Sequence, residues 1–105
     1  HRKFNRHGEF FDVGETFAGV PFDVALEAVE QVRPLVPEGV TMAQFALAWI
    51  LQSKAVSVVI PGARNEAQAK GNAAASDIAA PKPETMRALA DIYERLIKAH
   101  VHQKW

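Results

Sequence analysis

One stretch decides the fold of this chain: Ala55-Val56-Ser57-Val58-Val59-Ile60-Pro61-Gly62-Ala63-Arg64-Asn65. Its first half is short, β-branched and almost continuously apolar, which is typical of a strand covered on both faces in a parallel sheet. Pro61 and Gly62 then favour a tight turn, and Asn65 is a preferred helix N-cap. The stretch therefore predicts a strand at about 55–60 followed directly by a helix, which is half of a βαβ unit.

That strand has no partner in the rest of the sequence. No other segment combines β-branched residues with the length and pattern of a strand. A lone central strand leaves backbone N–H and C=O groups unpaired on both sides, and each is costly if it is buried. The chain also begins at His1 rather than at Met. We therefore expect the partner strands to lie outside these residues, in a longer protein of which this chain is a piece.

Helical patterns flank the predicted strand on both sides. Apolar residues recur at helical spacing from Phe22, and Pro34 disfavours continuation, which predicts a helix at about 22–35. Thr41 and Gln44 have the spacing of a capping box and open a helix at about 41–53. That helix is apolar almost all round, so we expect it to be buried, with Trp49 in the core.

Two more helices follow the strand. Asn65 caps a predicted helix at about 66–75, and Pro83 suits the first position of a helix at about 83–99. The apolar stripe of the last helix includes Tyr93, which is assigned to packing. The predicted organisation is a loop at 1–21, helices and the strand at 22–75, and a C-terminal helix and tail at 76–105.

Composition excludes several classes of protein. The chain has 105 residues, of which 49% are hydrophobic, so whole-chain disorder is excluded. Lys+Arg and Asp+Glu both number 12, which argues against a nucleic-acid binder or a polybasic membrane binder. There is no Cys, hence no disulfide and no thiolate site. With no long apolar run and no signal peptide, we expect no membrane association and a cytoplasmic location.

The turn after the strand is the candidate chemical site. A helix N-terminus presents free N–H groups to anions, and Gly62 permits close approach of a ligand to the backbone. Arg64 adds a planar cation suited to phosphate. Gln68 and Asn72 are four residues apart and share one helix face, which extends the site. The alternative interpretation is a capped loop with an exposed arginine and two solvated amides.

These residues resemble a known family. The run Val58–Asn65, followed by Gln68 and Asn72, is similar to the C-terminal cofactor segment of the aldo-keto reductases. The flanks agree, since Gly14-Glu15-Thr16-Phe17-Ala18-Gly19 and the stretch 41–51 look like the segments that precede the last barrel strand in bacterial members. The resemblance covers nearly the whole chain.

The resemblance implies an α/β fold. Residues 1–105 would be the C-terminal segment of a (β/α)₈ TIM barrel, mostly α-helical within this chain, with 55–60 as the eighth strand. The intact enzyme would reduce aldehydes or ketones by hydride transfer from NADPH. By resemblance, the residues that meet the adenosine end of NADP(H) are Gly62, Ala63, Arg64, Gln68 and Asn72. In the family a Glu commonly precedes the Asn, whereas this chain has Gly71.

The resemblance assigns no catalytic residue to this chain. The Asp, Tyr, Lys and His of the family's active site belong to earlier strands and loops, so the chain alone is expected to be inactive. His100 and His102 lack a third ligand, and no metal site is predicted. The expected partner is the remainder of the barrel, or a second copy joined through apolar surfaces. The alternative is a free-standing helical protein-interaction module derived from a barrel.

Overall fold

The computed structural model describes residues 19–104, and this part of the chain is entirely helical and irregular, with no strand. Most of the loop predicted at 1–21 lies outside the described residues. The chain divides into two compact units, His1–Pro34 with Arg87–Trp105 and Leu35–Met86. Among the described residues, no helix is long and apolar enough to cross a membrane.

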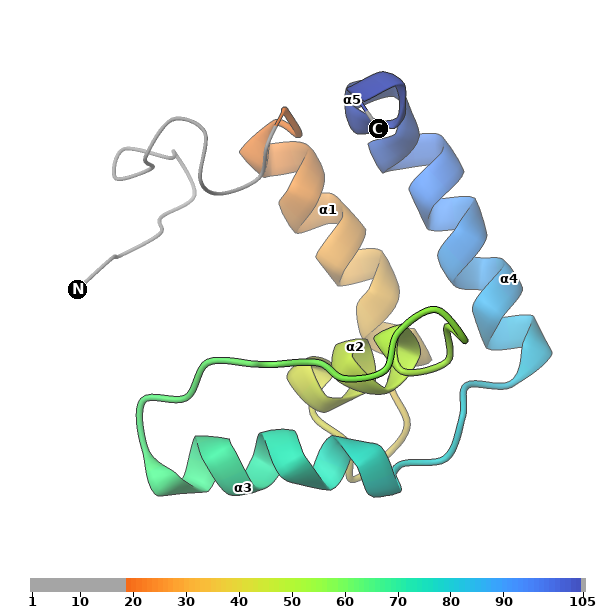
Figure 1. The fold of residues 1–105 in the computed structure, drawn as a ribbon. Helices are drawn as coiled ribbons and strands as arrows, with labels where there is room; N and C mark the ends of the chain where they lie inside the picture. Colours follow the sequence, from red (N-terminus) through yellow and green to blue (C-terminus); the bar gives the residue numbers. More distant parts are fainter. Residues whose placement is uncertain (1–18, 105) are drawn as a thin grey trace. The chain divides into compact units, whose positions relative to one another are not determined.

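The first unit contains the helix predicted at 22–35. It is α1, Phe22–Val32, followed by the 3₁₀ turn η1, Arg33–Leu35 (orange in Figure 1). The 3₁₀ turn includes Pro34, which cannot continue an α-helix. Arg33 donates two hydrogen bonds, of 3.0 and 2.8 Å, to the Glu30 carboxylate. That contact raises the pKa of the Arg33 guanidinium above its ordinary value.

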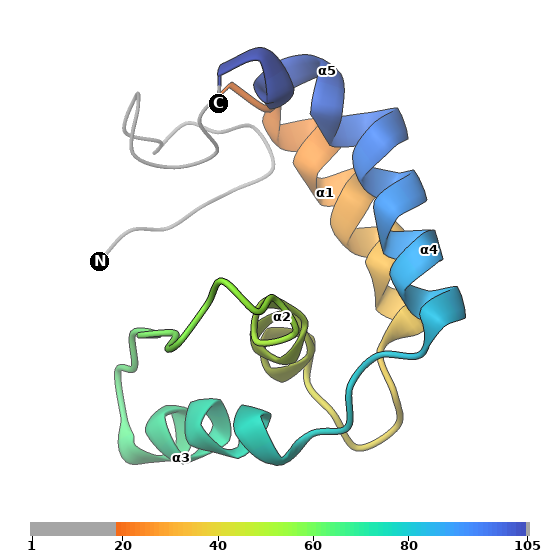
Figure 2. The same ribbon diagram turned by 45° about the vertical axis from the view of Figure 1, so that its right-hand side comes forward.

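The C-terminal helix is interrupted by a π-helical turn that its sequence pattern does not indicate. It consists of α4, Pro83–Ile92, the π turn η3, Tyr93–Ile97, α5, Lys98–Val101, and the 3₁₀ turn η4, His102–Lys104 (Figure 2). The Lys98 N–H bonds to the Tyr93 carbonyl, five residues earlier, which is the π-helical spacing. This turn packs on α1, and Arg95 donates a 2.6 Å hydrogen bond to Gln31.

The second unit begins with a tight turn and a capped helix. Val40 N–H bonds to the Pro37 carbonyl, and Gly39 takes the positive φ of 78° that the third position of such a turn requires. α2, Met42–Ile50, then starts with the predicted capping box, in which Thr41 and Gln44 exchange hydrogen bonds of 3.1 Å. The helix ends at Ile50 rather than at 53, because the next residues form 3₁₀-type bonds.

The core of the second unit lies where α2 meets the next helical segment. α3, Glu66–Ala74, is capped by Asn65 as predicted and runs into the 3₁₀ turn η2, Ala75–Asp77. α2 contacts both elements (Figure 1). The buried residues are Phe45, Ala48 and Ala75, each 2–3% exposed. The small residues Ala48 and Ala75 let the two segments approach closely. Apolar packing on α2 therefore holds α3 and η2 in place.

The strand predicted at 55–60 is absent. Residues 51–65 form an irregular connection, seen as a drawn-out trace between α2 and α3 (Figure 1). Val58 is 68% exposed and Ile60 is 90% exposed. A strand is held by ladder hydrogen bonds to a neighbour, and the described residues supply no second strand to make them. The fold class predicted from the resemblance is therefore only partly present in this chain, as its helical part.

The prediction that the helix at 41–53 is buried, with Trp49 in the core, is wrong. Trp49 is 47% exposed, and only Phe45 and Ala48 of this helix are buried. The second unit covers α2 on the face that meets α3 and η2. A helix packed on one face leaves apolar residues on its other faces in contact with water.

Candidate functional site

The site is the turn that leads from the irregular connection into α3. Asn65 lies in extended backbone, with φ −154° and ψ 169°, and its Oδ1 accepts a 2.9 Å hydrogen bond from the Gln68 N–H. This cap satisfies one of the free N–H groups at the start of the helix. The turn and the helix N-terminus are therefore held together by residues that are close in sequence.

Two side-chain amides from α3 reach back to this turn. Gln68 Oε1 accepts a 2.7 Å hydrogen bond from the Arg64 N–H, and Asn72 Nδ2 donates a 3.0 Å hydrogen bond to the Gly62 carbonyl. The structure thus brings together Gly62 with Asn72 and Arg64 with Gln68. Both amides bond to the turn instead of facing only solvent. They fix its backbone from the side of the helix.

The remaining groups of the turn can receive an anion. Within the described residues, the N–H groups of Gly62 and Ala63 have no hydrogen-bond acceptor and no carboxylate pairs with the exposed Arg64 guanidinium. Free N–H groups beside a helix N-terminus and an unpaired guanidinium are the donors that bind phosphate groups.

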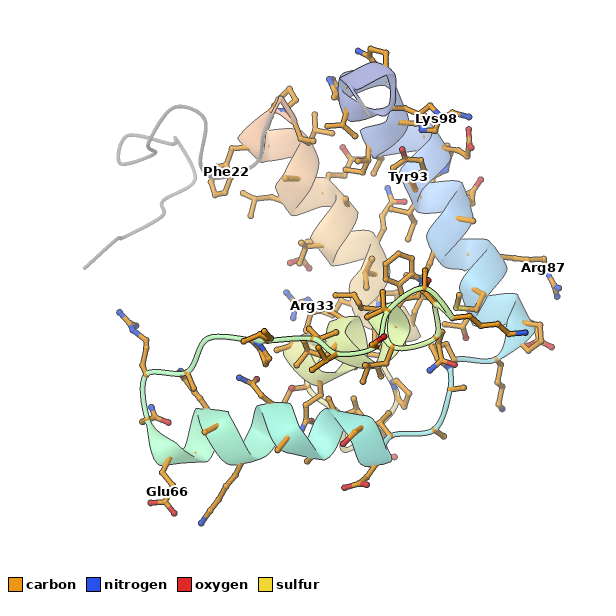
Figure 3. All side chains as sticks on the ribbon, in the orientation of Figure 1. Phe22, Arg33, Glu66, Arg87, Tyr93 and Lys98 are labelled. Atoms are coloured by element: carbon orange, nitrogen blue, oxygen red, sulfur yellow. The ribbon has the colours of Figure 1, made fainter. Side chains whose placement is uncertain are left out.

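The net charge around the turn is positive when the nearest charged residues of α3 are included. Glu66 pairs with Lys70 at 2.6 Å, four residues further on the same helix. Figure 3 shows the Glu66 side chain pointing away from the preceding connection. Arg64, Glu66 and Lys70 are two cations and one carboxylate, a net charge of +1. The turn therefore attracts an anion weakly at long range and binds it chiefly through close donors.

An open apolar groove lies beside the turn, within the same unit. Its volume is about 420 Å³ and it runs between α2, residues 57–63, α3 and η2. Its lining is mostly aliphatic and includes Leu47, Leu51, Val58, Val59, Pro61 and Ala69. Ala63 and Asn72 also line it, so the groove and the turn are continuous.

Sequence reasoning missed one residue of this region. Gln44 was expected only to cap α2, but its Nε2 also donates a 2.9 Å hydrogen bond to the Gly71 carbonyl on α3. An ideal Cβ at Gly71 would lie 3.9 Å from this nitrogen, which is an ordinary contact. The one available signal is that a capping-box glutamine uses its oxygen for the cap and leaves its NH₂ free for a distant acceptor.

Tyr93 and His102, on the C-terminal helix, contact each other. Tyr93 Oη lies 2.9 Å from His102 Nδ1, and the two rings meet edge to face at 6.2 Å. This contact joins the π turn η3 to the 3₁₀ turn η4 at the end of the helix. Among residues 19–104, no three His, Asp or Glu side chains come together in a group that could hold a metal ion.

Comparison with known proteins agrees with the resemblance seen in the sequence. The model of the aldo/keto reductase family matches residues 3–94, which include α1, α2, α3 and the turn 62–65. No curated protein and no solved structure matches the chain. Since the family match extends over most of the 105 residues, this chain belongs to the aldo/keto reductase family.

Proposed function

We propose that residues 62–72 hold the adenosine end of NADP(H) in an aldo-keto reductase that reduces aldehydes or ketones. The observation that carries the proposal is the turn itself, where free N–H groups at Gly62 and Ala63 stand beside the exposed Arg64 guanidinium. The family membership of the chain supports this use of the turn. The bound cofactor would supply the hydride that reduces the carbonyl.

The residues present suit the phosphorylated ribose of NADP(H). Arg64 and the N–H groups of the turn would meet the 2′-phosphate, because both are donors to an anion at a helix N-terminus. Gln68 and Asn72 would line the path toward the adenine, whose edge pairs with an amide. Gly71 has no side chain, so this chain lacks the carboxylate that the family commonly has at this position, and the place of a Cβ there lies 3.9 Å from Gln44 Nε2.

The proposal is tested by binding of a cofactor fragment to the full chain. Adenosine 2′,5′-bisphosphate is titrated into ¹⁵N-labelled protein, with adenosine 5′-monophosphate as the ligand lacking the 2′-phosphate. We expect the bisphosphate to shift the amide signals of residues 62–65 and the side-chain amides of Gln68 and Asn72. Equal responses to both ligands, or shifts confined to other regions, would refute the assignment of the 2′-phosphate to this turn.

A matched pair of arginine variants sharpens the test. Arg64→Ala removes the proposed phosphate ligand, whereas Arg87→Ala removes an exposed arginine of α4 in the other unit (Figure 3). Both variants lose one positive charge. Only Arg64→Ala is expected to abolish the preference for the bisphosphate, because a general charge effect would weaken binding in both variants alike.

The 105-residue chain by itself is expected to have no reductase activity. Its one tyrosine, Tyr93, contacts His102 on the C-terminal helix and is therefore engaged in packing that helix. The proton donor and the residues that orient the carbonyl would come from other parts of the barrel. An assay with NADPH and a panel of aldehydes and ketones checks this, and turnover above background by purified chain would contradict it.

We propose further that residues 55–60 pair with a strand supplied by the remainder of the barrel or by a second copy of this chain. Their β-branched side chains and the exposure of Val58 and Ile60 support this. Pairing would supply the ladder hydrogen bonds that the segment lacks and cover its apolar side chains. The segment then becomes the strand that its composition predicts.

A second candidate function is a free-standing helical interaction module. The observation that favours it is the exposure of Trp49 on α2, since aromatic residues are enriched in the buried centres of protein interfaces. The coding frame upstream of His1 discriminates the two. About 200 preceding residues with alternating strands and helices would establish the reductase barrel, and their absence would favour the module.

A further inference from the structure

Both ends of the Gln44 side-chain amide are used, and they serve two different helices. Its Oε1 accepts a 3.1 Å hydrogen bond from the Thr41 N–H at the start of α2. Its Nε2 donates a 2.9 Å hydrogen bond to the Gly71 carbonyl, 27 residues later in the chain and partly buried. The cap therefore holds the amide in one orientation, which aims its donor at α3.

The carbonyl of Gly71 is available because α3 tightens at its end. The Ala75 N–H, which in a continuing α-helix would bond to this carbonyl, bonds instead to carbonyls of Asn72 and Ala73. The segment then continues as the 3₁₀ turn η2. Carbonyls near a helix C-terminus need hydrogen-bond donors from outside the helix, and Gln44 Nε2 provides one here.

This bond acts on the part of α3 that serves the turn. Gly71 is next to Asn72, which bonds to Gly62, and lies less than one helical turn from Gln68, which bonds to Arg64. The face of α3 at Gly71 lies toward Gln44, because an added Cβ would be 3.9 Å from its Nε2. A hydrogen bond at this point restrains rotation of α3 about its own axis, and that rotation would move both amides relative to the turn.

We propose that Gln44 is a positioning residue of the turn 62–65: it fixes α3 against α2 so that Gln68 and Asn72 hold the turn in place. Its effect on cofactor affinity rests on the proposed function of that turn. Its effect on the hydrogen bonds of the turn does not depend on that function. One experiment can therefore test the positioning role of Gln44 and the cofactor-binding role of the turn separately.

The capping box offers a substitution that separates the two roles of Gln44. Gln44→Glu keeps an oxygen that accepts from the Thr41 N–H, since Glu is the other residue found at this position of a capping box. It removes the donor and places a carboxylate oxygen against the Gly71 carbonyl, where the two repel. The matched control is Thr41→Val, which removes the hydroxyl that caps the Gln44 N–H and leaves the bond to Gly71.

The first measurement needs no ligand. Amide hydrogen exchange is followed by NMR at the Arg64 N–H, which Gln68 holds, in the full 105-residue chain. We expect Gln44→Glu to speed this exchange about three- to tenfold, the change that follows from losing one hydrogen bond. Thr41→Val should speed exchange in the first turn of α2 and leave Arg64 near the wild-type rate.

The second measurement is the affinity for adenosine 2′,5′-bisphosphate, which Gln44→Glu should weaken by a similar factor and Thr41→Val should leave unchanged. If the exchange rate of the Arg64 N–H in Gln44→Glu equals that in the wild type, the proposed role of Gln44 is overturned. Failure of the wild-type chain to bind the bisphosphate would overturn the proposed function alone. If Gln44→Glu does not fold, Gln44→Met supplies an uncharged side chain of similar length, and faster exchange at Arg64 than in Thr41→Val remains the expected result.

Discussion

The side-chain amide of Asn72 donates a 3.0 Å hydrogen bond to the carbonyl oxygen of Gly62, ten residues earlier. Within the described residues, no backbone–backbone hydrogen bond holds residues 57–64. Residues 57–64 are therefore held to α3 by two side-chain bonds, this one and the bond between the Arg64 N–H and Gln68, while Asn65 adds the helix cap. The shape of the candidate phosphate site depends on side chains of the helix that follows it.

Removal of the Asn72 amide should loosen the turn while the helix remains. We expect Asn72→Ala to lower the free energy of unfolding by about 1 kcal/mol, the usual net contribution of one such hydrogen bond. It should also weaken binding of adenosine 2′,5′-bisphosphate. Thermal unfolding and titration measure the two effects. The control is Gln52→Ala, which removes a 3.0 Å bond to the Ala48 carbonyl on α2 and should leave binding unchanged.

Arg64 is expected to set the preference for NADP over NAD in the intact reductase. Its guanidinium forms charge-assisted hydrogen bonds to a 2′-phosphate, so Arg64→Ala should weaken NADPH binding about 10- to 100-fold. NADH has no 2′-phosphate and should bind almost as before. Fluorescence titration gives the ratio of the two affinities. An equal loss for both cofactors would mean that Arg64 supports the turn without contacting the phosphate.

The local features of the fold follow from the sequence because their partners are close in the chain. The capping box of Thr41 and Gln44 and the Asn65 cap involve residues three positions apart, and both are confirmed. The end of α1 is local too, since Pro34 disfavours continuation of the helix, and the last three residues of the predicted range 22–35 form a 3₁₀ turn. Such signals need no knowledge of what lies across the helix.

The features that the sequence did not predict depend on distant residues. Whether 55–60 forms a strand depends on a neighbouring strand, and whether Trp49 is buried depends on what covers the far face of α2. The bond between Gln44 and Gly71 spans 27 residues and uses a backbone acceptor, which has no side-chain signature. The apolar residues around the π turn at Tyr93 follow the spacing of an ordinary α-helix, so the sequence pattern does not indicate the π turn. The sequence pattern and residue propensities indicate where a helix or strand can form, whereas packing against distant residues decides which of its faces are buried.

Gly71 should be replaceable with a gain in stability. It lies inside α3 without a positive φ, and an added Cβ would meet only Gln44 Nε2, at 3.9 Å. We expect Gly71→Ala to raise the free energy of unfolding by about 0.5–1 kcal/mol, because alanine loses less backbone entropy in a helix. Gly39→Ala is the opposite control, since the φ of 78° at Gly39 strains any residue with a Cβ. Thermal melts that show the same sign for both variants would contradict this explanation.

The exposed segment 55–60 should drive association of the isolated chain. Ile60 is 90% exposed and Val58 is 68% exposed, and they sit in a β-branched run whose backbone can pair with another strand. We therefore expect dimers or larger species, or a loosely packed monomer, in sedimentation velocity and near-ultraviolet circular dichroism. A compact monomer with a sharp unfolding transition at all concentrations would contradict this.

A lysine at Ile60 tests whether this segment forms the contact. Ile60→Lys places a charge in the run, and like charges brought together by strand pairing repel, so the sedimentation coefficient should fall toward that of the monomer. Val29→Lys adds the same charge at another exposed apolar residue, on α1, and should leave association unchanged. Because Ile60 is almost fully exposed in the chain, its replacement removes little internal packing, and the melting temperature should stay within a few degrees of the wild type. An equal loss of association in both variants would mean that the added net charge, and not the position of the lysine, prevents association. No loss in either variant would mean that the contact lies outside residues 55–60.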